Sequence, residues 1–80
     1  MAVTILFLGP LRDLAGRDAL EVAAPLDWAG LQEAVGAEVA AQIGNDRVNV
    51  ACAGRVLTDK TALAANDGDE IALLPPVSGG

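Results

Sequence analysis

The last residues of the sequence have the types and spacing best suited to chemistry. The chain ends in Gly79-Gly80 after the uncharged segment Pro75-Pro76-Val77-Ser78, and its last charged side chain is Glu70. Two prolines stiffen the start of this segment, whereas two glycines lack a Cβ and keep its end slim. Residues 76–80 span at most about 17 Å when extended, so the terminal carboxylate can enter a narrow tunnel in another protein.

A carboxylate at the end of such a tail has a specific reactivity. It is a poor acyl donor until ATP converts it to an acyl-adenylate, which a sulfur nucleophile can then attack to give a thiocarboxylate. Gly80 is therefore the predicted reactive residue. A Gly-Gly ending alone is weak evidence, because chain termini are often small and polar. The stiff spacer and the order of the preceding elements favour the functional interpretation.

The first half of the chain predicts two strands and a helix. Residues 3–8 are largely apolar at both alternating sets of positions, which indicates a central strand covered on both faces. Residues 19–23 return as the second strand of a hairpin-like pair. Asp27 can cap a helix that Gly36 can split in two. The apolar stripe of this helix consists of Leu31, Val35, Val39 and Ile43.

The second half predicts three more strands. One strand places Val48, Val50 and Cys52 on one face, and a turn at Ala53-Gly54 leads to a short strand at residues 55–57. Residues 58–65 form a connection in which Leu63 is the apolar anchor. Residues 69–74 form the last strand, which Pro75-Pro76 cannot extend inside a sheet.

This order of elements predicts an α+β roll of the β-grasp (ubiquitin-like) type. We expect a mixed sheet of about five strands with one main helix packed on one face. Residues 1–75 form the predicted domain, and residues 76–80 form a flexible C-terminal tail.

Composition excludes several classes of function. Eleven acidic residues against five basic ones give a net charge of −6, and the basic residues are scattered, so nucleic-acid binding is not expected. With no histidine and one cysteine, the chain lacks the ligands of a Cys/His zinc site, and we expect no metal and no cofactor. The apolar run at residues 3–8 is too short for a signal peptide or a membrane span. A lone Cys52 fits a reducing compartment, so we expect a cytoplasmic protein without a membrane partner.

Two segments resemble one known family. The ending DGDEIALLPPVSGG, residues 67–80, and the opening stretch of residues 3–16, with its RDLAG sequence after the first strand, are similar to the small, sulfur-carrying subunit of molybdopterin synthase. The resemblance spans nearly the whole chain, and the C-terminal stretch is its specific part. One departure is the turn at Ala53-Gly54, where the family often has Asn-Gly.

The resemblance implies a role in molybdenum cofactor biosynthesis. Gly80 would be adenylated and converted to a thiocarboxylate by a separate ATP-dependent activating enzyme. The tail would then enter the large synthase subunit, in an expected heterotetramer, and give sulfur to cyclic pyranopterin monophosphate. A dithiolene needs two sulfur atoms, so two carriers act per molybdopterin. The general acid and base would belong to the large subunit, so the chain is not expected to be catalytic alone.

The docking candidates are Ile71, Leu73 and the segment of residues 75–77, together with the tail residues Ser78 and Gly79. Ordinary strand packing is the alternative role for these docking candidates, and for Ile71 the sequence favours it at least as much as docking. Cys52 has no evident basic partner to lower its pKa, which favours a structural thiol over a nucleophile.

Three other functions stay open at this point. One is a sulfur carrier of another pathway, such as thiamine thiazole synthesis. Another is a ubiquitin-like protein modifier joined through Gly80 to lysines of other proteins. The last is an interaction module without terminal chemistry, in which removal of Gly80 would leave function intact.

Overall fold

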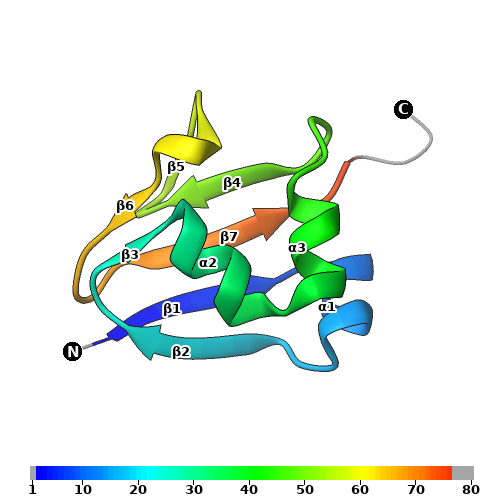
Figure 1. Cartoon of the computed structure of the whole chain (residues 1–80), viewed down its shortest axis with the longest axis horizontal. Helices are drawn as coiled ribbons and strands as arrows, with labels where there is room; N and C mark the ends of the chain where they lie inside the picture. The colour runs from blue at the N-terminus through cyan, green and yellow to red at the C-terminus, as the bar shows by residue number, and fades with distance from the viewer. Residues whose placement is uncertain (1, 77–80) are drawn as a thin grey trace.

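The computed structural model describes residues 2–76 as a sheet with helices on one side (Figure 1). Helices and strands follow one another in this order: β1 (Ala2–Phe7), α1 (Pro10–Ala15), β2 (Ala19–Ala23), β3 (Leu26–Asp27), α2 (Trp28–Val35), α3 (Ala37–Ile43), β4 (Asn49–Cys52), β5 (Arg55–Val56), the 3-10 helix η1 (Lys60–Ala62), β6 (Ala64–Ala65) and β7 (Glu70–Leu74).

The main sheet has five strands in the order β2-β1-β7-β4-β5. β1 pairs antiparallel with β2 and parallel with β7, and β7 pairs antiparallel with β4. Both β1 and β7 are therefore interior strands, as predicted for β1. This mixed sheet with its helices confirms the predicted α+β roll.

The core lies between the sheet and the helices. β1 contributes Val3, Ile5 and Phe7, which face Leu31, Val39 and Ile43 from the helical side. The alternate residues of β1, such as Thr4 and Leu6, are half-exposed. The prediction that β1 is covered on both faces is therefore wrong. The apolar residue Leu6 predicts burial of this second set, but the set lies on an open face of the sheet.

The predicted helix begins at its predicted cap. Asp27 accepts a hydrogen bond from the Gly30 backbone N–H at 2.8 Å, which satisfies one of the free donors at the start of α2. Gly36, at φ 89°, separates α2 from α3, because this left-handed conformation cannot continue a right-handed helix. The stripe residues Leu31, Val39 and Ile43 are buried, and Val35 is half-buried.

The sequence did not indicate a small second sheet. β3 and β6 pair antiparallel, with Leu26 opposite Ala65. Leu63, the predicted anchor, is 3% exposed and precedes β6. Strands of two residues are too short to show a period of two, so only the folded chain reveals the pairing.

Candidate functional site

The C-terminal segment leaves the body from an interior strand. β7 runs between β1 and β4, and Pro75 follows it as a half-buried residue. A Cβ placed on Gly9 would lie 3.4 Å from Pro75 Cγ, so the exit passes close to the turn between β1 and α1. Gly9 has φ 54°, a conformation that favours glycine. Pro75 thus lies close to this turn, while Pro76 is exposed.

Four of the predicted site residues lie outside the described part of the chain. These are Val77, Ser78, Gly79 and Gly80. Their predicted roles stay predictions, and the site that the structure places is the body surface next to them.

The side chains of Ile71 and Leu73 are both 0% exposed. They point toward the helices and pack in the core, so neither side chain can contact a partner of the folded chain. Their assignment as docking residues is corrected to strand packing, the alternative that the sequence left open for Ile71. Because side chains alternate along a strand, the other residues of β7 occupy the opposite face.

An apolar row crosses that opposite, open face of the sheet. In the strand pairings, Leu6 is opposite both Ala19 and Ala72, Ala72 is opposite Ala51, and Ala51 is opposite Val56. Residues directly opposite one another project on the same face of a sheet. Val56 is 59% exposed, and Leu6, Ala51 and Ala72 are half-exposed. We call these five residues the apolar row.

Two glutamates lie beside the apolar row on the same face, at the level of Thr4, two residues before Leu6 in β1. Thr4 is opposite Glu21 on one side and Glu70 on the other, and both glutamates are exposed. On the far side of the apolar row, Leu74 is half-exposed and lies opposite Asn49. Leu74 therefore connects the apolar row to Pro75, where the tail begins.

Sequence reasoning missed the apolar row. The available indication was the alternation in EIALL, residues 70–74, in which Ile71 and Leu73 form one set and Ala72 and Leu74 the other. The sequence does not say which set faces the helices. The hydrophobicity of Ile71 and Leu73, which predicts docking residues, is the property that places both side chains in the core.

Cys52 does not have the surroundings of a reactive thiol. It is half-buried, and its Sγ lies 3.9 Å from Oδ2 of Asp69. Partial burial and the nearby Asp69 carboxylate both raise the pKa of the Cys52 thiol, because each disfavours the thiolate. The thiol therefore stays protonated at neutral pH, which agrees with the structural role predicted for it.

Possible metal ligands and membrane-spanning helices can be sought among the described residues. Between Ala2 and Pro76, His, Cys, Asp and Glu side chains form no group of three or more that could hold a metal ion. In the same part of the chain, the helices are too short or too polar to span a bilayer.

Comparison with known proteins places these features in a family. A family model described as the ThiS family matches residues 5–80. The molybdopterin synthase sulfur carrier subunit of Escherichia coli (strain K12) is 38% identical over 90 aligned positions, which cover 98% of this chain and 99% of that protein.

Two solved structures from Haloferax volcanii share the fold. The HVO 2177 protein superposes with a TM-score of 0.76 at 27% identity, covering 100% of this chain and 87% of that one. SAMP1, the small archaeal modifier protein 1, gives a TM-score of 0.73 at 28% identity and covers 100% of both chains. The fold is thus the ubiquitin-like β-grasp fold of small sulfur carriers and modifiers. Because the family model matches nearly the whole chain, and a relative of almost equal length is 38% identical, this chain belongs to the ThiS family.

Proposed function

We propose that this chain is the sulfur-carrier subunit of a molybdopterin synthase. A thiocarboxylate at Gly80 donates sulfur to cyclic pyranopterin monophosphate, and two such donations complete the dithiolene of molybdopterin. The proposal is supported by similarity to the Escherichia coli sulfur carrier subunit over 98% of this chain. The observation that carries it is structural: an interior strand, β7, ends at Pro75 beside an open apolar face of the sheet, and the sequence continues from there to Gly79-Gly80.

The proposed chemistry needs a separate activating enzyme that uses ATP. An oxygen of the Gly80 carboxylate attacks the α-phosphorus of ATP, pyrophosphate leaves, and an acyl-adenylate forms. Sulfur at the sulfide level, as hydrosulfide, then attacks the carbonyl carbon, the carbon–oxygen bond to AMP breaks, and a thiocarboxylate remains after loss of a proton. Since the pKa of the only thiol, Cys52, is raised, this chain is a poor source of the nucleophile. The catalytic groups therefore belong to the activating enzyme and to the large synthase subunit.

The docking surface that we assign to both partners is the apolar row together with Leu74 and Pro75. It is next to the exit of the tail, so a protein that covers it can receive residues 76–80 in a tunnel. The acidic pair Glu21 and Glu70 borders this surface, so its partner should carry basic side chains at the matching rim. The predicted assembly is a heterotetramer of two carriers and two large subunits in the cytoplasm.

A second candidate function is protein modification. The similarity to SAMP1, a small archaeal modifier protein, favours it at 28% identity. In this function the activated Gly80 would be attacked by a lysine amine of another protein, giving an isopeptide bond. A carrier for thiazole synthesis would use the same activation but a different acceptor of sulfur.

The test is the intact mass of the chain after incubation with an adenylating enzyme of the molybdopterin pathway, ATP and a sulfur donor. The expected result is a mass gain that matches replacement of one oxygen by sulfur. A chain that lacks Gly80 is the control and should gain nothing. No mass change with an enzyme that activates its own carrier would overturn the proposal. Isopeptide adducts in cell extract, without transfer of sulfur to the pterin, would favour the modifier function instead.

A further inference from the structure

Lysine amines compete with sulfur nucleophiles for an activated carboxyl group, so the lysines of a carrier matter for its chemistry. The five basic residues of this sequence are four arginines and one lysine, Lys60. An isopeptide bond between a lysine of one copy and Gly80 of another can therefore form only at Lys60.

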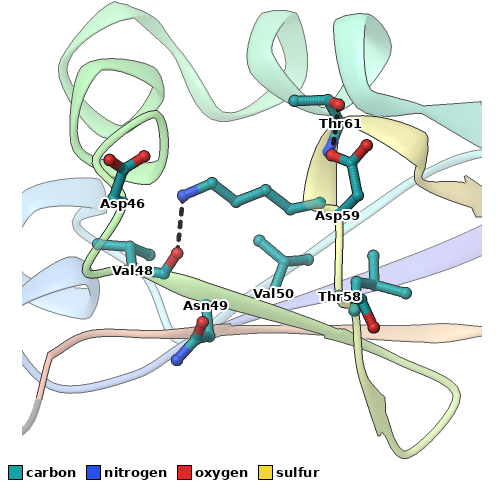
Figure 2. Close-up of a pocket in the computed structure, with 9 residues that line it drawn as sticks. Asp46, Val48, Asn49, Val50, Thr58, Asp59 and Thr61 are labelled. Atoms are coloured by element: carbon teal, nitrogen blue, oxygen red, sulfur yellow. Dashed lines mark hydrogen bonds between the residues drawn. The ribbon is translucent and has the colours of Figure 1, made fainter.

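The half-buried side chain of Lys60 has its amine tied to the backbone. Its Nζ donates hydrogen bonds to the backbone carbonyl oxygens of Asn45 and of Val48, the latter at 2.7 Å. Figure 2 shows the bond to Val48 across a pocket that Val50, Thr58 and Asp59 also line. Nζ lies 6.0 Å from the centre of the Trp28 ring, within the range of a cation–π interaction.

The residues around Lys60 fix this arrangement. Asp59 caps η1 and accepts a hydrogen bond from the backbone N–H of Thr61 at 3.0 Å, which sets the position of the turn that carries Lys60. The two acceptor carbonyls belong to the connection between α3 and β4, and the Asn45 oxygen also accepts a hydrogen bond from the Val48 backbone N–H at 3.0 Å. The Lys60 ammonium thereby ties η1 to this connection, through residues 12 and 15 positions away from it in the sequence.

We propose that this fold withholds Lys60 from acylation, so that an activated copy of the chain cannot link itself to another copy. In that reaction the Lys60 nitrogen would bond to the Gly80 carbonyl carbon, the carbon–oxygen bond to AMP would break, and the amine proton would pass to solvent. The biological role of this inference rests on the proposed activation of Gly80. The hydrogen bonds that hold Lys60 do not depend on that proposal.

The amine must leave both carbonyl oxygens and lose a proton before it can attack. Hydrogen bonds from a charged donor are stronger than neutral ones. The free energy needed to break both bonds adds to the barrier of acylation. Lys60 should therefore be acylated about tenfold to a thousandfold more slowly than a free lysine. An amine held in this way leaves the sulfur nucleophile as the faster reaction partner of the activated carrier.

The matched control is Arg47→Lys. Arg47 is exposed and lies in the same connection as Asn45 and Val48, and the substitution leaves the net charge unchanged. Each molecule of this variant carries Lys60 and a free lysine in one electrostatic environment. Acetylation by N-hydroxysuccinimide acetate, followed by peptide mass spectrometry over time, compares the two sites within one sample.

We expect acetylation of Lys60 to be at least about tenfold slower than that of the lysine introduced at position 47, and equally fast in concentrated urea. In a second arm, each protein is incubated with the activating enzyme and ATP but without a sulfur donor. Wild type should form no dimer linked through Lys60, whereas Arg47→Lys should form dimers linked at position 47. Equal acetylation rates in the folded protein, or a wild-type dimer linked through Lys60, would overturn the inference. Failure of activation in the second arm would count against the proposed function alone, since the acetylation arm needs no enzyme.

Discussion

Leu6 and Ala72 lie opposite each other where β1 and β7 run parallel, and both side chains are on the open face of the sheet. Their neighbours Phe7 and Leu73 form the next pair, on the core face, and are 2% and 0% exposed. The same two strands thus build the core with one alternating set of residues and the proposed docking surface with the other. This division gives separate predictions for stability and for binding.

Replacement of Ala72 by arginine should weaken binding to the large synthase subunit at least about tenfold, because it places a charge in the centre of the apolar row. Stability should change by less than about 1 kcal/mol, since the side chain can extend into solvent. Isothermal titration with the purified large subunit measures the first effect, and urea unfolding measures the second.

The control for this prediction is Ala23→Arg, the same substitution on the same face at the far end of β2. It should leave the dissociation constant within about twofold of wild type, as for a residue outside an interface. Wild-type affinity in Ala72→Arg would show that the partner docks elsewhere.

Leu73→Ala should mainly lower stability and Leu74→Ala should mainly weaken binding, although the residues are adjacent. Leu73→Ala removes a fully buried side chain and should lower the free energy of unfolding by about 2–5 kcal/mol. Leu74→Ala should cost about 1 kcal/mol but should weaken binding of the partner. Urea unfolding and titration of the two variants provide the comparison. Similar losses of stability in both would contradict the assignment of faces.

Ala53→Asn should stabilise the chain. Ala53 has φ 53° and Gly54 has φ 83°, so both central residues of the turn between β4 and β5 are left-handed. This pattern is typical of a type I′ turn, in which Asn-Gly is preferred. Relief of the strain at alanine should raise the free energy of unfolding by about 0.5–1 kcal/mol.

The matched control for the turn is Gly54→Ala, which introduces a Cβ at positive φ and should destabilise by about 1 kcal/mol or more. Both values come from chemical unfolding at one temperature. A less stable Ala53→Asn variant would mean that contacts outside the turn set its conformation.

Gly30→Ala should destabilise the protein, although helix propensity alone predicts a gain of about 1 kcal/mol. An added Cβ would lie 2.9 Å from Leu26 Cδ1 and 3.1 Å from Asp27 Oδ1. Leu26 is buried and Asp27 holds the helix cap, so displacement of either has a cost, and we expect a net loss of about 1 kcal/mol. Ala29→Gly, at the exposed neighbouring position of α2, is the control and should lose about 1 kcal/mol through propensity alone. A more stable Gly30→Ala would show that Leu26 repacks freely.

The raised pKa of Cys52 predicts a loss of stability in alkaline solution. The folded chain holds the thiol proton more tightly than the unfolded chain, whose thiol has the ordinary pKa of 9.0. This contribution to stability is fully present below that pH and is lost as the pH rises through the raised pKa of the folded thiol. Urea unfolding at pH 7.5 and at pH 10 should therefore show a larger loss for wild type than for Cys52→Ala. Equal losses would mean that Cys52 titrates as it does in the unfolded chain.

Much of the architecture followed from local patterns in the sequence. The stripe of Leu31, Val39 and Ile43 identified the helical face that packs on the sheet, because residues three and four apart share one side of a helix. Asp27, Gly36 and the Ala53-Gly54 turn identified boundaries, because capping and positive φ depend on single residues. The Gly-Gly ending with its stiff spacer predicts a reactive terminus, since that chemistry needs only the covalent structure of the chain.

Contacts between distant segments decided the rest. Only the packing of the helices determined that Ile71 and Leu73 face the core while Ala72 and Leu74 face outward, because a period of two has no preferred side until one face is covered. The small sheet of β3 and β6 and the carbonyl oxygens that hold Lys60 join residues far apart along the chain. Such contacts leave no local pattern, so the surface beside Pro75 and the hydrogen-bonded lysine became visible only in the folded protein.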